Sequence, residues 1–395
     1  MSQIIKKNIL FVNHSSEITG GANDEFIRLL KYFSEFKDEY NIYGLFPEGP
    51  NAVNYSIFCK EWKTYPTYFF PVMSGNIIHY IGYIKNYFIQ KKITKEFLKN
   101  IQFDICILNV VVMLWLTILL KNNNSKCLIF IREKIEPNII RKIYYKIINK
   151  YGDYFVAVSD SLKSDFKDST KNENIITLYS SIEKDLHYKE YYSDFKKKLK
   201  DLKISDLVFG NQLKFINVAA IEDRKNQILI LESLNILKER GCQLPIFFFI
   251  GGDLEGKYAV KLKKFILLKN LSSNCFFLGR ADKNFLYNLL SFMDCMVIAS
   301  KSEGLPLVMV ESLRFKVPLI TTNVGGIKDI IRNGYNGITF GLDKNELANV
   351  ISDVLDNKNL RIEISESGFE TYNEKFNLER NLNNIKDIVD NLITN

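Results

Sequence analysis

The sequence predicts a doubly wound α/β protein with two domains, and three observations support this. Short apolar stretches of strand length alternate with amphipathic stretches of helical spacing, which is typical of parallel sheets covered by helices. The chain has 395 residues, long for one hydrophobic core and sufficient for two. A charged, tyrosine-rich stretch separates two series of predicted strands. We therefore expect domains at residues 1–183 and 213–376, with a linker at residues 184–212.

The predicted strands fall into a first series of seven and a second series of six. The first series comprises Ile9–Asn13, Asn41–Leu45, Tyr65–Phe70, Ile105–Asn109, Leu128–Ile131, Tyr154–Val158 and Ile175–Leu178. The second comprises Lys214–Ala219, Pro245–Ile250, Cys275–Leu278, Cys295–Ile298, Pro318–Thr321 and Gly337–Phe340. A short basic helix is expected within the linker at Asp194–Leu202, and a final helix at Asn377–Asn395 has no strand after it.

The composition, 47% hydrophobic and 25% charged, is that of a soluble globular protein. The longest apolar run, Val110–Leu120, is shorter than the roughly 18 residues of a membrane-spanning helix. No signal peptide precedes the first predicted strand. The six cysteines are scattered without close pairing, so we expect free thiols in a reducing compartment. These features predict a cytoplasmic protein.

The net charge of +8 is concentrated in the first half of the chain. Residues 60–150 hold fifteen Lys and Arg against five Asp and Glu. Within them, Ile77–Asn100 interleaves tyrosines with lysines, a composition found in helices that lie on anionic membranes. Two interpretations stay open: peripheral binding to the inner face of the cell membrane, or an ordinary surface helix. No nucleic-acid-binding module accompanies the charge, so no nucleic-acid partner is expected.

One segment, residues 300–313, combines a loop, a helix start and two carboxylates. Met296–Ala299 predicts a buried strand, and Pro306 has the fixed φ that suits the first position of a helix. The first turn of such a helix offers unpaired N–H groups and the positive end of the helix dipole, which favour phosphate. Glu303 precedes this turn, and Glu311 follows the helix start by roughly 7 Å along the axis. The arrangement suits a nucleotide sugar. The alternative is that Glu303 simply favours a helix N-terminus and that Glu311 lies on a solvated helix face.

A glycine pair follows the first predicted strand, in the loop His14–Ala22. Gly20 and Gly21 would let backbone N–H groups approach a phosphate or an acceptor without a Cβ in the way. The alternative is a simple loop before a helix. Neither first strand is followed by Gly-x-Gly-x-x-Gly, which argues against a nicotinamide dehydrogenase. With three histidines and no Asp-x-Asp pair, no metal site or other cofactor is expected.

Four blocks in the second half together resemble one known family. They are similar in order and spacing to the carboxyl-terminal half of the family 4 (group 1) retaining glycosyltransferases: Phe277–Arg280, Ala299–Glu311, Pro318–Gly326 and Asn333–Gly337. The amino-terminal half resembles that family mainly in strand order and in its Gly-Gly loop. The resemblance implies a GT-B fold, with two Rossmann-like domains facing across a cleft. The second domain would bind the donor and the first the acceptor, and the helix at residues 377–395 would pack back on the first.

The resemblance also implies roles for single residues. Glu303 would hold hydroxyls of the donor sugar, Glu311 the ribose, and Lys225 the diphosphate that leaves, where its charge would replace a metal. For Lys225 the alternative is a solvated loop lysine. The donor-binding set implied is Gly20, Gly21, Arg224, Lys225, Gly251, Arg280, Glu303, Gly304, Leu305, Pro306, Leu307, Val308 and Glu311.

The sequence departs from the family pattern at three places. Ala219 stands where the family often has an arginine, so Arg224 is a candidate substitute. Lys316 stands where a glycine is frequent before the proline, which removes an easy helix C-cap. Arg132 stands where many members have a histidine that faces the reacting carbon. Arg132 and His14 are therefore catalytic candidates beside Glu303 and Lys225, with a buried Arg–Glu pair and a structural histidine as the alternatives.

The expected activity is transfer of a hexose or aminohexose from a nucleoside diphosphate sugar to an acceptor hydroxyl, with retention. A glycan or lipid-linked acceptor, as in capsule, O-antigen or glycolipid assembly, fits the basic first half. The base, which could be that of UDP, GDP or ADP, stays open. Two alternatives keep the same donor site: a sugar-nucleotide epimerase, for which three histidines are a thin supply of acid/base groups, and a non-catalytic sugar-nucleotide-binding protein.

Overall fold

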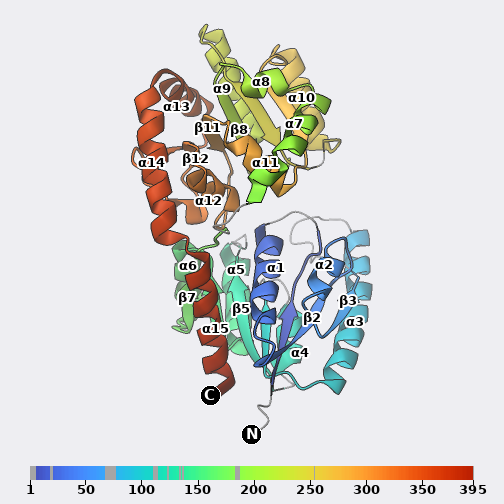
Figure 1. Ribbon diagram of the computed structural model, residues 1–395. Helices are drawn as coiled ribbons and strands as arrows, with labels where there is room; N and C mark the ends of the chain where they lie inside the picture. The colour runs from blue at the N-terminus through green and yellow to red at the C-terminus, as the bar shows by residue number, and fades with distance from the viewer. Residues whose placement is uncertain are drawn as a thin grey trace. The chain divides into compact units, whose positions relative to one another are not determined.

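The computed structural model describes residues 6–17, 21–66, 77–109, 114–121, 124–132, 135, 138–182, 187–252 and 254–394. The chain divides into two compact units, each built on one parallel sheet with helices around it (Figure 1). Unit 1 consists of Met1–Tyr179 and Glu379–Asn395, and unit 2 is Ser180–Leu378.

Unit 1 contains a seven-stranded sheet in the order β3-β2-β1-β4-β5-β6-β7. Its strands are short and mostly buried, as the apolar runs predict, and comprise β1 (Lys7–Val12), β2 (Tyr40–Pro47), β3 (Glu61–Tyr65), β4 (Ile105–Leu108), β5 (Lys126–Ile131), β6 (Tyr154–Ala157) and β7 (Ile175–Thr177). The connecting helices are α1 (Gly21–Ser34), α2 (Ala52–Ser56), α3 (Ile77–Asn100), α4 (Leu114–Lys121), α5 (Asn138–Tyr151) and α6 (Asp160–Thr170).

The last helix, α15 (Leu378–Thr394), belongs to unit 1 and lies beside α1 (Figure 1). Ile385 and Val389 are part of the hydrophobic core of unit 1. Around this apolar contact, Tyr32 donates a hydrogen bond to Asn383, at 2.6 Å, and Tyr40 donates one to Asp390. Helix α15 therefore contributes to the hydrophobic core of unit 1, although it follows unit 2 in the sequence.

Unit 2 contains a six-stranded sheet in the order β10-β9-β8-β11-β12-β13. Its strands are β8 (Lys214–Val218), β9 (Ile246–Ile250), β10 (Cys275–Gly279), β11 (Cys295–Ile298), β12 (Leu319–Thr322) and β13 (Ile338–Phe340). Its α-helices are α7 (Tyr192–Asp201), α8 (Ser205–Phe209), α9 (Gln227–Glu239), α10 (Lys257–Leu268), α11 (Lys283–Leu290), α12 (Leu307–Arg314), α13 (Lys344–Asp356) and α14 (Lys358–Lys375). The described residues of unit 2 also form three 3-10 helices: η1 (His187–Tyr191), η2 (Asp223–Lys225) and η3 (Gly325–Asp329).

Twelve of the thirteen predicted strands coincide with strands of the described residues, but the third lies earlier than expected. The prediction was Tyr65–Phe70, whereas β3 ends at Tyr65, and residues 67–70 lie outside the described part of the chain. The strand was missed because its residues Glu61, Trp62 and Lys63 are exposed at the edge of the sheet and show no apolar alternation.

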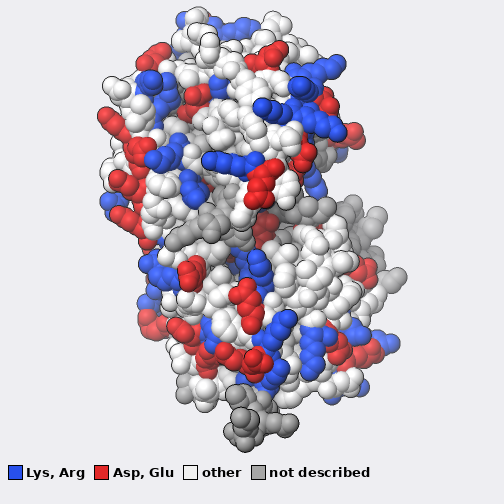
Figure 2. Space-filling view, in the orientation of Figure 1, with Lys and Arg blue, Asp and Glu red and all other residues white. Residues whose placement is uncertain are grey.

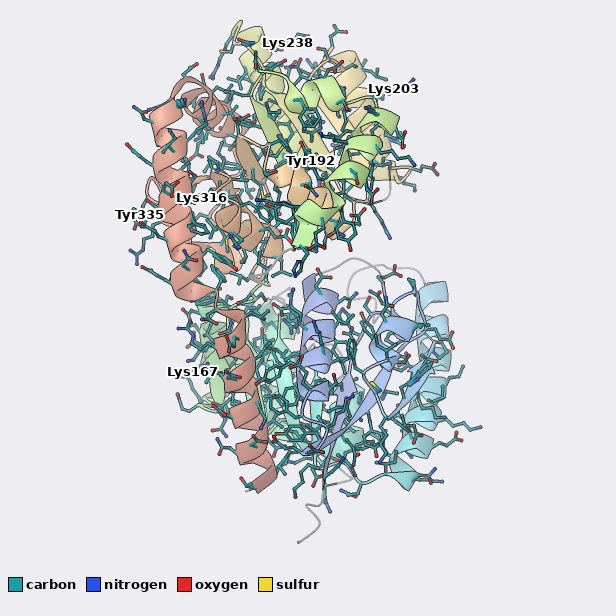
Figure 3. The ribbon with its side chains drawn as sticks, in the orientation of Figure 1. Lys167, Tyr192, Lys203, Lys238, Lys316 and Tyr335 are labelled. Carbon is teal, nitrogen blue, oxygen red and sulfur yellow. The ribbon has the colours of Figure 1, made fainter. Side chains whose placement is uncertain are left out.

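Two local expectations at helix ends also need correction. Helix α12 begins at Leu307, and Pro306 is its N-cap residue with φ −72° and ψ 123°, because extended backbone precedes the helix there. After the same helix, Lys316 adopts the left-handed φ of 54° that a glycine would favour. Its side chain (labelled in Figure 3) pairs with Glu366 at 2.6 Å, so the turn forms without glycine.

The segment predicted as a linker is largely structured and packs within unit 2. Helix α7 and η1 both contact α11. Phe195 of α7 is buried and its ring stacks on Phe292, 5.9 Å between centroids. Lys198 pairs with Asp282, the N-cap residue of α11, at 3.2 Å.

Candidate functional site

The residues predicted for the donor site in unit 2 all follow the carboxyl ends of parallel strands. Lys225 follows β8, Gly251 follows β9 and Arg280 follows β10, while Glu303 follows β11. Because the strands run in parallel, these loops meet at one edge of the sheet, where open α/β sheets bind ligands.

Glu303 is the centre of a compact charged cluster. Its side chain is 7% exposed, and its Oε1 atom accepts hydrogen bonds from Lys225 Nζ at 2.5 Å and from Ser300 Oγ at 2.6 Å. Arg224 lies on the other side, with Nη1 3.5 Å from Oε2. A buried carboxylate needs such partners, since an unpaired charge away from water is costly. The structure thus brings Glu303, Lys225 and Arg224 together, although they are 78 or 79 positions apart in the sequence.

Backbone packing fixes the loop that carries Glu303. The hydroxyl of Thr322 donates to the carbonyl oxygen of Ser300 at 2.7 Å, and the amide of Gly326 donates to the carbonyl oxygen of Gly304 at 2.6 Å. Gly325 has a φ of +53°, and a Cβ atom at this position would collide with the carbonyl oxygen of Glu303. The loop after β12 therefore lies directly against the loop after β11, and only glycine permits that approach.

Glu311 lies in α12, fully buried. Its Oε1 atom accepts hydrogen bonds from Lys283 Nζ at 2.5 Å and from the Tyr287 hydroxyl at 3.3 Å. Its Oε2 atom is buried and accepts no hydrogen bond from the described residues. A buried carboxylate oxygen without a donor has unused capacity for a hydroxyl group. The interpretation of Glu311 as a solvated surface residue is therefore wrong.

The remaining residues of unit 2 predicted for the donor site lie in the loops after β9, β10 and β11 and at the start of α12. Leu305, Pro306 and Leu307 are buried, and Gly304 and Val308 are half-buried at the start of α12. Gly251 donates from its amide to the carbonyl oxygen of Gly279 at 3.0 Å, and a Cβ there would collide with the carbonyl oxygen of Ala219. The side chain of Arg280 is exposed and passes over Gly252.

In unit 1, a buried polar network joins the ends of three adjacent strands. Asn13 follows β1, Asn109 follows β4 and Arg132 follows β5. Asn109 donates to Asn13 Oδ1 at 2.9 Å, and Arg132 Nε donates to the carbonyl oxygen of Asn109 at 2.9 Å. Arg132 also forms an ion pair with Glu25 of α1. Burial lowers the pKa of Arg132 to about 9, which leaves the guanidinium charged at neutral pH. The Arg–Glu alternative thus describes its contacts, with Glu25 as the partner.

His14 adjoins this network at the end of β1. Its amide donates to Asn13 Oδ1 at 3.0 Å. Burial, and secondly the charge of Arg132, lower the pKa of His14 to about 4. The imidazole is therefore neutral at pH 7 and is a weak proton acceptor. Of the glycine pair, Gly20 lies outside the described residues, and Gly21 is the first residue of α1.

Sequence reasoning missed several residues of these clusters. Ser300, Lys283 and Gly325 all contact a predicted glutamate or its loop, and Glu25 partners Arg132. Ser300 could have been suspected from its place three residues before Glu303 in the same loop. Nothing in the local sequence distinguishes Lys283, which lies 28 residues from Glu311.

Comparison with known structures identifies the fold class. Anabaena HepE in complex with UDP-glucose superposes with a TM-score of 0.75 at 16% identity, covering 97% of this chain and 99% of that one. At this identity the likeness shows the fold alone. It confirms the predicted α/β GT-B class, that of two-domain glycosyltransferases.

Sequence comparison finds similarity to one family over part of the chain. Residues 200–371 match the family model described as "Glycosyl transferases group 1". An uncharacterized glycosyltransferase of Methanocaldococcus jannaschii is 25% identical over 65% of each chain. The GalNAc-alpha-(1->4)-GalNAc-alpha-(1->3)-diNAcBac-PP-undecaprenol alpha-1,4-N-acetyl-D-galactosaminyltransferase of Campylobacter jejuni is 28% identical over 45% of this chain. The matches span 65% and 50% of the lengths of these two relatives.

Two further observations concern membrane-spanning helices and metal ligands. Within the described part of the chain, no helix has both the length and the apolar character needed to cross a membrane. The same residues contain no group of three or more His, Cys, Asp and Glu side chains arranged to hold a metal ion.

Proposed function

We propose that this chain is a group 1 glycosyltransferase that transfers a hexose or aminohexose from a nucleoside diphosphate sugar to an acceptor hydroxyl. The observation that carries the proposal is the Glu303–Lys225–Arg224 cluster beside the first turn of α12, with Glu311 further along the same helix. Each part of a nucleotide sugar has a matching group here. Glu303 suits the sugar hydroxyls, the two cations and the helix amides suit the diphosphate, and Glu311 suits the ribose.

Donor binding would exchange the ion pair of Lys225 and Glu303 for two contacts with the substrate. The diphosphate attracts Lys225 and the amides of Leu307 and Val308, which lack intrahelical acceptors in the first turn. Sugar hydroxyls then donate to the freed carboxylate of Glu303. Because Ser300 still donates to Glu303, the carboxylate keeps its position when Lys225 turns to the phosphate.

Bond cleavage at the anomeric carbon places negative charge on the leaving diphosphate. Lys225 and the amides of α12 would stabilise that charge, which is why we propose that no resident metal is needed at this step. The acceptor hydroxyl loses a proton as it attacks, and an oxygen of the departing diphosphate accepts that proton. We propose retention of configuration, which follows from the family resemblance. His14 is neutral, so in unit 1 it would orient a hydroxyl by a hydrogen bond, and Arg132, held by Glu25, would keep His14 in that state.

The acceptor is proposed to be a glycan or a lipid-linked sugar, as in surface polysaccharide or glycolipid assembly. The Campylobacter relative is named for an acceptor linked to undecaprenyl diphosphate. In the described part of α3, Phe88 is exposed beside Lys92 and Lys95, which favours a cytoplasmic enzyme that binds peripherally to an anionic membrane.

Incubation with a nucleotide sugar, with and without a mixture of glycan and lipid-linked acceptors, tests the proposal. A transferase releases nucleoside diphosphate and forms a glycoside only when the acceptor is present. An epimerase of the same fold would act on the donor alone, and a binding protein would leave all components unchanged. Glu303→Ala should abolish transfer while the protein remains folded; full activity of this variant would refute the assignment.

A further inference from the structure

Helix α10 of unit 2 exposes apolar side chains on its outer surface. Its inner side packs Ala259, Leu262 and Ile266 into the core. On the opposite side, Val260 is 54% exposed, Leu267 68% and Leu268 70%. In a soluble helix these outward positions normally carry polar residues, so exposed neighbouring leucines need an explanation.

The charged residues on the same outer surface are all lysines. Lys257, Lys261 and Lys264 are exposed and alternate with the apolar residues at helical spacing, and the helix contains no Asp or Glu. Lysine and arginine side chains gather at the edge of unit 2 that carries α7 and α10 (Figure 2). We call six exposed residues on the outer side of α10 the α10 surface: Lys257, Val260, Lys261, Lys264, Leu267 and Leu268.

The end of α10 that bears the leucines is fixed to its neighbour. Lys238 of α9 (labelled in Figure 3) donates to the carbonyl oxygens of Lys269 and Asn270, both at 2.9 Å. Asn270 continues with a φ of 50°, which turns the chain back towards the sheet. These contacts anchor the two residues that directly follow Leu267 and Leu268.

We propose that the α10 surface binds an anionic lipid bilayer. Charge complementarity favours a bilayer as the partner of this surface. Several lysines without an acidic residue are attracted to a negatively charged membrane, and the aliphatic side chains between them can enter the boundary between head groups and acyl chains. A bilayer also makes no demand for a complementary groove, which suits one convex helix. The α10 surface is a second contact, in unit 2, beside the one proposed above for α3 of unit 1, and it does not depend on catalysis.

Vesicle co-sedimentation of the full chain tests this proposal. Wild-type protein is expected to bind vesicles that contain phosphatidylglycerol, and to bind pure phosphatidylcholine vesicles at least tenfold more weakly. Lys261→Glu with Lys264→Glu should weaken binding to anionic vesicles at least tenfold, because each lysine near such a surface contributes about fivefold. Leu267→Ser with Leu268→Ser should weaken it severalfold without a change of charge.

Matched controls come from the α13 and α14 side of unit 2, away from α10 in Figure 1. Lys344→Glu with Lys358→Glu changes the charge equally, and Leu342→Ser with Ile362→Ser removes leucine and isoleucine side chains that are 54% and 49% exposed. Both controls should keep wild-type binding. Equal losses in controls and α10 variants, or no loss in either, would overturn the proposal.

Two further measurements separate membrane binding from dimer formation and from nucleotide-sugar binding. Sedimentation equilibrium without lipid should show the same mass for wild type and the α10 variants; a wild-type dimer that the variants lose would overturn the proposal in favour of a second copy. Thermal stabilisation by nucleotide sugars should be unchanged in the α10 variants. Failure of the α10 proposal would therefore appear as unchanged vesicle binding of the α10 variants, and failure of the transferase assignment as absent nucleotide-sugar binding.

Discussion

The Nζ atom of Lys225 lies 2.5 Å from Oε1 of Glu303, and the two residues come from loops that follow β8 and β11. Each neutralises the other while both are largely buried, with 15% and 7% of their side chains exposed. Burial of the two charges costs desolvation free energy, which their mutual attraction and the hydrogen bond from Ser300 to Glu303 offset.

Lys225→Ala should lower kcat by about 100-fold or more, because it removes a cation from a group that becomes more negative in the transition state. The control is Lys301→Ala. Lys301 also lies in this region, but it is exposed and pairs with Asp223 at 2.6 Å. Initial rates with the donor under saturation test the prediction. Equal rates for both variants would mean that Lys225 has no role in stabilising the leaving group.

Ser300→Ala should lower kcat/KM about tenfold, since a hydrogen bond to a charged group contributes roughly 1.5–3 kcal/mol and here positions the Glu303 carboxylate. Ser300→Thr, which retains the hydroxyl, should recover most of the activity. Ser312→Ala is the control, because it removes another buried hydroxyl, bonded to the Val317 carbonyl at 2.7 Å, without touching Glu303. A loss of stability with unchanged kinetics in Ser300→Ala would show a purely structural role.

Gly325→Ala should destabilise the protein by several kcal/mol and reduce activity, as a Cβ would collide with the backbone of Glu303. Gly334 is the matched control. It also has positive φ, +75°, but a Cβ there meets nothing within 4 Å. Gly334→Ala should therefore cost only about 1 kcal/mol and leave activity intact. Urea unfolding and initial rates check both variants; similar effects in the two would contradict the close approach of the loops.

The stability of unit 1 should fall as pH decreases from about 6.5 to 4. His14 has a pKa lowered from 6.5 to about 4 by burial, and in this range the unfolded chain binds a proton that the folded chain does not. The linked loss of unfolding free energy reaches about 3 kcal/mol at pH 4. His14→Gln should flatten this part of the profile. His187→Gln changes an exposed histidine paired with Glu190 and should leave the slope as in the wild type. An unchanged slope in His14→Gln would show that the histidine titrates normally.

The sequence predicted those elements and site residues that depend on local residue patterns. Twelve strands and the helix α3 could be recognised from apolar runs and spacing, and Glu303 and Lys225 from a resemblance confined to motifs. The edge strand β3 could not, because an exposed edge carries charge in place of an apolar pattern. The partners Ser300, Lys283 and Glu25 were also missed, since which side chains meet across loops depends on the packing of distant strands.

The departure at Lys316 shows a similar limit. The missing glycine removes an easy helix C-cap, yet Lys316 itself adopts the left-handed conformation, and its ammonium group pairs with Glu366 and lies 4.8 Å from the ring of Phe369. A sequence motif records the residue that most easily satisfies a backbone conformation, and tertiary contacts decide whether another residue is accepted.

Binding of a nucleoside diphosphate sugar by the carboxylates and cations of unit 2 can be measured as thermal stabilisation, since a ligand that binds the folded state raises its melting temperature. UDP, GDP and ADP with their sugars should be screened against the wild type, Glu311→Gln and Lys225→Ala, with Glu363→Gln on the exposed side of α14 as the control. We predict that one nucleotide series raises the melting temperature of the wild type and of the control, and that Glu311→Gln and Lys225→Ala lose this shift. No shift with any nucleotide, or an equal shift in all four proteins, would contradict the assignment.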